Sequence, residues 1–171
     1  MSTSEWPITV RPAMVQDVPA ITELYNYYVR TSPISFDIEP VSIQSRLDWF
    51  SHYAERGRHR LLVAICGAEL LGYAGSSQLR PRPAYDTSVE TSIYVHHEHF
   101  RSGIASRLYT TLFDLLRDED VHRAYAGVTL PNEASVALHR KFGFVDLGVY
   151  HEVGRKFGRY WDVAWLEKPL Q

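Results

Sequence analysis

The stretch of sequence that decides the fold reads Tyr94-Val95-His96-His97-Glu98-His99-Phe100-Arg101-Ser102-Gly103-Ile104-Ala105-Ser106. It joins the end of a strand to a short polar loop and the first turn of an amphipathic helix. Because Gly103 and Ala105 keep large side chains away from that turn, its unpaired N–H groups point outward and the helix dipole adds positive charge. This helix start predicts a site for a pyrophosphate, with Arg101 and Arg107 at its rim. An ordinary helix start with a tolerated glycine is the alternative, since the segment lacks a triphosphate-loop motif and a full dinucleotide fingerprint.

Apolar periodicity on either side of this stretch predicts a chain of mixed strands and helices. Residues Ile8–Arg11 alternate apolar and polar side chains as a half-buried strand does. Asp17 is the expected N-cap of the helix that follows. The expected helices are 17–31, 42–56, 102–117 and 131–142, and the expected strands are 8–11, 61–65, 70–77, 88–95, 124–129, 145–153 and 160–167. This order implies a mixed α/β sheet with a covered core.

Length, charge and cysteine content narrow the class of protein. The 171 residues suit one domain over residues 1–171. A formal net charge of -2 argues against nucleic acid or an anionic membrane as the main partner, and no apolar run reaches the length of a membrane helix. The segment Met1–Pro7 has no signal-peptide pattern. The single cysteine, Cys66, has apolar neighbours, so we expect a buried inert thiol, no internal disulfide and a cytoplasmic protein.

A second motif downstream gives the helix start at Gly103 a specific meaning. It lies within Leu130–Phe144 and includes Asn132 and His139-Arg140-Lys141-Phe142-Gly143-Phe144. Together with Arg101–Ala105, this motif resembles the GNAT superfamily of N-acetyltransferases. Further segments look like the phosphinothricin and methionine sulfoximine acetyltransferases within it: Tyr25–Val29, Ala84–Asp86, Val89–Val95 and Leu130–Asn132. The resemblance extends over nearly the whole chain.

The resemblance implies a fold, a co-substrate and a set of binding residues. The fold would be a GNAT-like mixed, largely antiparallel central sheet, flanked by helices on both faces and splayed beside the phosphate loop. Acetyl-CoA would lie in that gap. The backbone of Ile93, Tyr94 and Val95 would pair with its pantetheine arm, Asn132 would contact the arm, and the amides of Arg101, Ser102, Gly103, Ile104, Ala105 and Ser106 would hold its pyrophosphate.

Phe100 departs from the superfamily pattern, because Gln or Arg is usual at its position. A cradle made of backbone N–H groups does not need that side chain. We therefore expect a change in how acetyl-CoA is anchored rather than its loss.

Acetyl transfer to an amine needs a base, since free amines are largely protonated at pH 7, and it benefits from a proton donor for the departing thiolate. Glu90 is the candidate base, a role that the subgroup resemblance also gives it. The alternative is a strand carboxylate that faces solvent or pairs with Arg80 or Arg82. His139 stands where much of the superfamily has the tyrosine that protonates the thiolate, and an imidazole can do the same near neutral pH. A half-buried histidine on a helix face is the other interpretation, and both stay open.

Acceptor binding is expected just before the strand that carries Glu90. Arg80 and Arg82 could hold the carboxylate and the phosphinate or sulfoximine oxygens through paired hydrogen bonds, with Tyr85 beside them. A solvated basic turn broken by prolines is the alternative. Phe36 is a candidate for the pocket wall. The spacing of His96, His97 and His99 lacks a metal-site pattern, so we expect no metal there.

The sequence thus predicts an acetyl-CoA-dependent N-acetyltransferase that acts on the α-amine of a small amino-acid analogue, of the phosphinothricin or methionine sulfoximine class. One alternative is a protein or peptide N-acetyltransferase, which an open groove would suit. Another is a non-catalytic acyl-CoA-binding sensor, against which the presence of both Glu90 and His139 argues. The subgroup resemblance also implies a homodimer, with the aromatic-rich C-terminal segment as a candidate interface.

Overall fold

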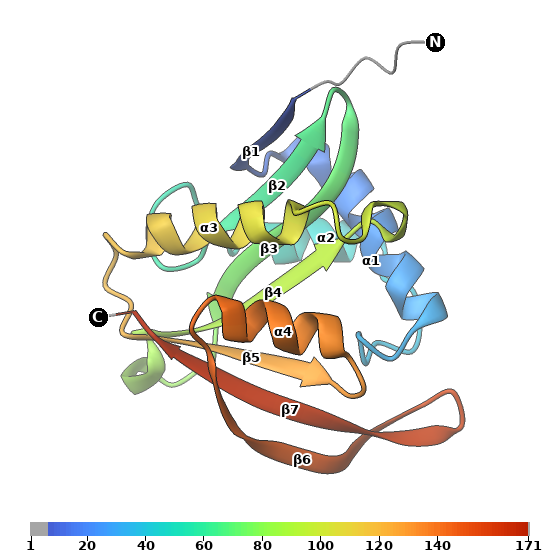
Figure 1. Ribbon diagram of the computed structural model, residues 1–171. Coiled ribbons are helices and arrows are strands. Elements are labelled where there is room, and N and C mark those ends of the chain that lie inside the picture. Colours follow the sequence, from blue (N-terminus) through green and yellow to red (C-terminus); the bar gives the residue numbers. More distant parts are fainter. Residues whose placement is uncertain (1–6, 171) are drawn as a thin grey trace.

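The structure, a computed structural model, describes residues 7–170, and its strands form one twisted sheet (Figure 1). Residues 1–6, which carry most of the segment examined for a signal peptide, lie outside the described residues. The strands are β1 (Ile8–Pro12), β2 (Leu61–Cys66), β3 (Glu69–Gln78), β4 (Ser88–Val95), β5 (Arg123–Thr129), β6 (Val145–Lys156) and β7 (Arg159–Pro169). Their order in the sheet is β1-β2-β3-β4-β5-β7-β6, and every neighbouring pair is antiparallel except β4 and β5. The predicted mixed, largely antiparallel sheet is therefore confirmed.

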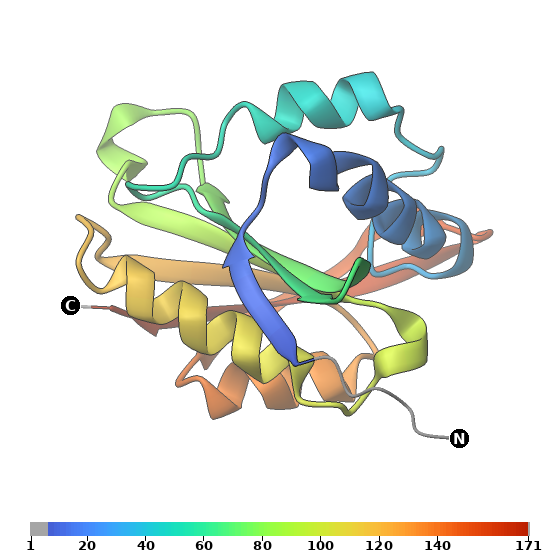
Figure 2. The ribbon, with the colours of Figure 1, turned by 90° about the horizontal axis from the view of Figure 1, so that it is seen from above.

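Helices cover both faces of this sheet, as predicted. They are α1 (Val18–Thr31), α2 (Ile43–Phe50), α3 (Ile104–Leu116) and α4 (Glu133–Lys141). Figure 2 shows α1 and α2 on one face and α3 and α4 on the other. Each face of the sheet has its own hydrophobic core, and strand β2 contributes side chains to both. Leu61 and Val63 pack with α1 on one face, while Leu62 and Ala64 pack with α3 on the other. No helix within residues 7–170 is long and apolar enough to cross a membrane.

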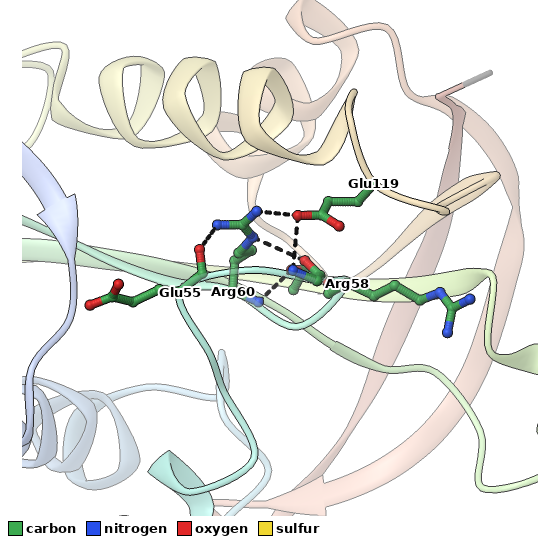
Figure 3. Close-up of polar contacts among 6 residues, drawn as sticks. Glu55, Arg58, Arg60 and Glu119 are labelled. Atoms are coloured by element: carbon green, nitrogen blue, oxygen red, sulfur yellow. Dashed lines mark hydrogen bonds and ion pairs between the residues drawn. The ribbon is translucent and has the colours of Figure 1, made fainter.

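Two expected helix boundaries are wrong, and each has a local cause. Helix α2 ends at Phe50 rather than near residue 56, because the guanidinium of Arg60 binds the backbone carbonyls of Glu55 and Gly57 and pairs with Glu119 (Figure 3). These bonds hold the following segment as a loop. Helix α3 begins at Ile104 rather than Ser102, since Gly103 takes the N-cap position with a left-handed φ of 79°.

Several smaller expectations need the same kind of correction. The last two strands extend beyond their predicted ends, to Lys156 and Pro169. Asp17 does stand at the N-cap of α1, but its carboxylate binds the guanidinium of Arg11 and the N–H of Met14. Cys66, expected to be buried, is half-buried at the end of β2.

The gap between β4 and β5 is the feature that positions the site. The two strands pair only from Ser88 to Glu90, and β4 then continues alone to Val95. The N–H of His96 bonds to β3, at the carbonyl of Leu71, with a distance of 2.8 Å. Since peptide groups alternate in direction along a strand, those of Ile93 and Val95 face the gap. The Val95 carbonyl accepts a hydrogen bond from the Tyr28 hydroxyl.

Candidate active site

A cleft of about 320 Å³ opens where the gap meets the start of α3. All ten residues predicted to bind the co-substrate line it: Ile93, Tyr94, Val95, Arg101, Ser102, Gly103, Ile104, Ala105, Ser106 and Asn132. One detail of the prediction changes. By the register of β4, the peptide groups of Tyr94 face β3, so the expected backbone pairing falls to Ile93 and Val95. Tyr94 contributes its ring to the cleft.

The start of α3 has the geometry that an anion requires. Both Arg101 and Gly103 adopt positive φ angles, of 64° and 79°, which turn the chain sharply into the helix. Gly103 lines the cleft, and an ideal Cβ on it would meet nothing within 4 Å. This open helix start, beside unpaired backbone groups of β4, fits an extended molecule with a pyrophosphate at one end. The residues present therefore fit acetyl-CoA.

A second pocket, of about 410 Å³, adjoins the cleft and shares five lining residues with it: Ile34, Ile93, Tyr94, Asn132 and Ser135. It holds both predicted catalytic residues, Glu90 and His139, together with Phe36. Its remaining walls come mainly from α1, α3, β5, β6 and β7 and include the aromatic side chains of Tyr25, Tyr109, Tyr150 and Trp165. We call this the acceptor pocket.

Glu90 occupies the last position at which β4 still pairs with β5. Its side chain is half-buried, and burial raises the pKa of its carboxyl above the ordinary value of 4.5, while the charge of Arg80 opposes that shift. A carboxylate that binds a proton more readily is better matched to base catalysis near neutral pH. This position supports the interpretation of Glu90 as a base over that of a surface carboxylate.

His139 lies in the last turn of α4 and is buried, with 3% of its surface exposed. Its Nδ1 is 2.7 Å from the carbonyl oxygen of Ser135, and its Nε2 is 2.9 Å from the hydroxyl of Tyr109. Burial lowers the pKa of the imidazole. The ring is thus neutral at pH 7, and both nitrogens have hydrogen-bond partners within the protein.

The wall that contains Phe36 is fixed by polar contacts from distant parts of the chain. The hydroxyl of Tyr25 donates to Asp37 at 2.6 Å and is 2.7 Å from the hydroxyl of Ser35. The buried ammonium of Lys156 donates to the carbonyl of Ser35 at 2.7 Å. The Phe36 ring packs directly on β6 at Gly154, where a Cβ would come within 2.1 Å of it.

Arg80, Arg82 and Tyr85 lie outside the residues that line the acceptor pocket. All three are exposed, and Arg80 donates to the adjacent carbonyl of Leu79. Arg80 nevertheless acts on Glu90 through its charge. The structure thus brings the predicted co-substrate and catalytic residues together with Phe36 in two adjoining clefts. Arg80, Arg82 and Tyr85, predicted to bind the acceptor, lie outside the lining of both.

Sequence reasoning missed three side chains of the acceptor pocket: Tyr25, Tyr109 and Trp165. Tyr109 carried a usable signal, because its hydroxyl interrupts the otherwise apolar face of α3 beside Leu108 and Leu112. The indole N–H of Trp165 is buried without a hydrogen-bond partner. Tyr25 belongs to a segment that resembles the subgroup, but that resemblance assigned it no role. No local pattern marks Trp165, since its place in the pocket depends on how β7 packs near β4.

The splayed sheet, the helix start beside it and the adjoining pocket define the class of protein. The profile of the Acetyltransferase (GNAT) family matches residues 21–144, and the chain belongs to that family. It is an N-acetyltransferase that uses acetyl-CoA.

Individual relatives sharpen this assignment. The chain is 54% identical over 165 residues to the phosphinothricin N-acetyltransferase of Streptomyces coelicolor, covering 95% of this chain and 96% of that protein. It is 32% identical over 162 residues to the L-methionine sulfoximine/L-methionine sulfone acetyltransferase of Pseudomonas paraeruginosa, covering 95% and 94%. The crystal structure of a phosphinothricin acetyltransferase from Sinorhizobium meliloti in complex with AcCoA superposes with a TM-score of 0.89 at 31% identity, covering 95% and 88%.

Proposed function

We propose that the acceptor is the α-amine of a small amino-acid analogue of the phosphinothricin or methionine sulfoximine class. The observation that carries this proposal is the acceptor pocket itself. At about 410 Å³ it has the size of a small-molecule site, and it joins the co-substrate cleft at Ile93 and Tyr94. The names of the relatives from Streptomyces and Pseudomonas support the same acceptor class.

The proposed steps of acetyl transfer follow from the side chains that lie where the acceptor pocket meets the co-substrate cleft. Glu90 takes a proton from the incoming ammonium, directly or through water, so that the neutral amine attacks the thioester carbonyl. The N–H groups of Ile93 and Val95 face the gap and hold the reacting end of acetyl-CoA, while those at the start of α3 hold the pyrophosphate. His139 is proposed as the second residue that handles a proton in the transfer.

Arg80, Arg82 and Tyr85 remain proposed as acceptor-binding residues. They stand immediately before β4, the strand that carries Glu90, and the charge of Arg80 reaches that carboxyl. A substrate with a carboxylate and a second polar head loses water on entry, and arginines can replace that water with charge-assisted hydrogen bonds.

The proposal is tested by release of free thiol from acetyl-CoA with a panel of acceptors. Phosphinothricin and methionine sulfoximine should give the highest kcat/KM, above that of ordinary L-amino acids. Short peptides, polyamines and aminoglycosides serve as comparison acceptors. Higher efficiency with peptides would assign the chain to protein or peptide acetylation, and acetyl-CoA binding without turnover on any amine would favour a non-catalytic sensor.

We also propose that the chain forms a homodimer and acts in the cytoplasm. Strand β6 is at the edge of the sheet, and exposed apolar side chains gather along it and its turn: Val145, Leu147, Val149, Tyr150, Val153, Phe157 and Tyr160. Light scattering after size exclusion should give twice the chain mass, and a Leu147→Lys, Val149→Lys variant should give the monomer mass. The single cysteine in 171 residues is consistent with a reducing compartment.

A further inference from the structure

The hydrogen bonds around His139 determine which proton its ring carries. A carbonyl oxygen can only accept, so the 2.7 Å contact to the Ser135 carbonyl requires the proton to be on Nδ1. In the neutral ring Nε2 is then an acceptor, and its partner at 2.9 Å, the Tyr109 hydroxyl, must donate. His139 therefore has no proton of its own to give at Nε2.

Tyr109 contacts this ring and lines the same pocket as it does. It comes from α3, its side chain is fully buried, and it lines the acceptor pocket together with Glu90 and Thr91. Its hydroxyl oxygen is also 3.5 Å from the hydroxyl of Thr91, which donates its own proton to the carbonyl of Tyr125. Of the two acceptors that the Tyr109 hydroxyl can reach, Nε2 of His139 is the nearer, at 2.9 Å. Phe113 and Phe142 pack against the ring and hold it in place.

We propose that the Tyr109 hydroxyl is the catalytic group that exchanges protons with the reacting atoms, and that His139 is a positioning residue that acts through it. This proposal rests on the proposed function, since it concerns the same transfer. It assigns a catalytic role to a residue on α3. His139 then does not donate a proton to the substrate directly, but accepts the hydroxyl proton of Tyr109 and returns it.

The proton balance of the relay closes without any further reactant. As the amine nitrogen attacks, the C–N bond forms and the nitrogen becomes positively charged. Its proton passes to the Tyr109 oxygen while the hydroxyl proton of Tyr109 moves to Nε2 of His139, which becomes an imidazolium held at Nδ1 by the Ser135 carbonyl. When the C–S bond breaks, the proton now on the Tyr109 oxygen goes to sulfur and the Nε2 proton of the imidazolium returns to the Tyr109 oxygen. Glu90 releases the proton of the ammonium to solvent. Amide and thiol leave, and the pair returns to its starting state.

Two features of the surroundings suit this cycle. The contacts of the His139 ring are the carbonyl and the more distant hydroxyl of Ser135, at 2.7 and 3.4 Å, with Tyr109 and Phe144, and none of these is an anion that would hold a charged ring. The other titratable side chains that line the pocket are Glu90, Tyr25, Tyr94 and Tyr150, and Glu90 is the one carboxyl among them. Glu90 removes the first proton, that of the incoming ammonium, and the relay moves the second, from nitrogen to sulfur.

A double-mutant cycle on kcat tests the relay. Tyr109→Phe and His139→Gln should each lower kcat by roughly 10²-fold with little change in the Kd of acetyl-CoA, and the double variant should be no slower than the slower single variant. Tyr73→Phe is the matched control. Tyr73 is almost fully buried, accepts a hydrogen bond from Arg46 and lies outside both clefts, so its loss should lower thermal stability and leave kcat near wild type. Multiplicative losses in the double variant, or a wild-type kcat for Tyr109→Phe, would overturn the proposal.

The protonation state of His139 provides a test that needs no turnover. In ¹⁵N NMR spectra of the whole protein at pH 7, His139 should show a protonated Nδ1 and an unprotonated Nε2. The Nε2 shift should move in Tyr109→Phe and stay unchanged in Tyr73→Phe. A proton on Nε2 would refute the relay even if the acceptor panel confirms the acetyltransferase. The expected tautomer in a protein that acetylates no amine would instead count against the proposed function alone.

Discussion

The co-substrate cleft and the acceptor pocket share five lining residues, Ile34, Ile93, Tyr94, Asn132 and Ser135, but the rest of each lining comes from different parts of the chain. The cleft takes most of its remaining wall from one continuous stretch, 99–106, and presents backbone groups at a helix start. The acceptor pocket takes its wall from side chains on both helix layers and on β4 to β7. A backbone cradle tolerates changes of side chain, whereas a pocket made of distant side chains depends on how the elements pack.

The same difference appears in what holds each part in place. The cleft depends on two left-handed backbone positions, Arg101 and Gly103, within three residues of each other. The wall of the acceptor pocket at Phe36 depends on Tyr25 from α1 and on Lys156 and Gly154 from β6. Substitutions should therefore abolish co-substrate binding only at a few backbone positions, but alter acceptor choice at many side chains.

The largest effect is expected at the backbone of the cleft. Gly103→Val places a β-branched side chain at a φ of 79° and in front of the first N–H groups of α3. We expect acetyl-CoA to bind roughly 100-fold more weakly or not at all, by about 2.7 kcal/mol or more. Isothermal titration calorimetry and the shift of Tm with acetyl-CoA measure the loss.

Gly57 offers a matched control for this substitution. It has a φ of 93°, nothing within 4 Å of a Cβ, and a place in the loop that Arg60 and Glu119 fasten, outside both clefts. Gly57→Val should lower Tm through the same kind of strain and leave acetyl-CoA affinity unchanged. If Gly103→Val keeps the full ligand-induced shift, the pyrophosphate is held elsewhere.

The next effect concerns the base in the acceptor pocket. Glu90→Gln should lower kcat by roughly 10²-fold near neutral pH, because the shape stays and the base is lost. The deficit should shrink at high pH, where the amine is neutral without help. A pH–rate profile for both proteins measures this, and equal activity across the whole range would remove Glu90 from the mechanism.

For Glu90→Gln we also predict the direction in which the melting temperature changes. Burial raises the pKa of Glu90, so the folded protein binds this proton more tightly than the unfolded chain does. The free energy of unfolding of the wild type therefore falls as pH rises from the ordinary value of 4.5 through the raised pKa. Glu90→Gln should have a higher Tm than wild type at pH 7, and the two should converge below the ordinary value. A lower Tm at pH 7 would mean that the carboxylate is stabilised in the fold.

Smaller effects are expected at the two arginines before β4, and the pH dependence of kcat/KM should distinguish one from the other. Arg80→Gln and Arg82→Gln should each raise the KM of the acceptor by roughly threefold to tenfold, as loss of a charge-assisted hydrogen bond does at an accessible site. Arg80→Gln should also move the acid limb of kcat/KM to higher pH, because its charge no longer lowers the pKa of Glu90. Arg82→Gln should leave that limb in place. Identical profiles for both would show that neither charge reaches Glu90.

The contrast between the two regions also explains what the sequence could predict. The strands and the helix after Gly103 follow from local periodicity. The ten residues that the family resemblance implied for the co-substrate all line the cleft, because most of them lie in two short stretches next to each other in sequence, 93–95 and 101–106. Glu90 and His139 carried motif signals as well. The side chains of Tyr25, Tyr109 and Trp165 meet only after α1, α3 and β7 have packed around β4, and no spacing along the chain encodes that meeting. The end of α2 was missed for the same reason, because Arg60 and Glu119 are far apart in sequence.

The smallest effect should come from the side chain that departs most from the superfamily pattern. Phe100 lines the co-substrate cleft at its mouth, with 61% of its surface exposed, directly before the left-handed Arg101. An exposed side chain loses little burial on truncation, and the N–H groups of α3 that face the pyrophosphate belong to later residues. Phe100→Ala and Phe100→Gln should therefore each change the Kd of acetyl-CoA by less than about threefold, or about 0.7 kcal/mol, in the titration that detects the loss in Gly103→Val. A tenfold tighter Kd in Phe100→Gln alone would show that a polar side chain adds to the cradle, and a tenfold weaker Kd in both would show that the ring itself is a binding surface. Either result would mean that the cleft, like the acceptor pocket, depends on a side chain as well as on backbone.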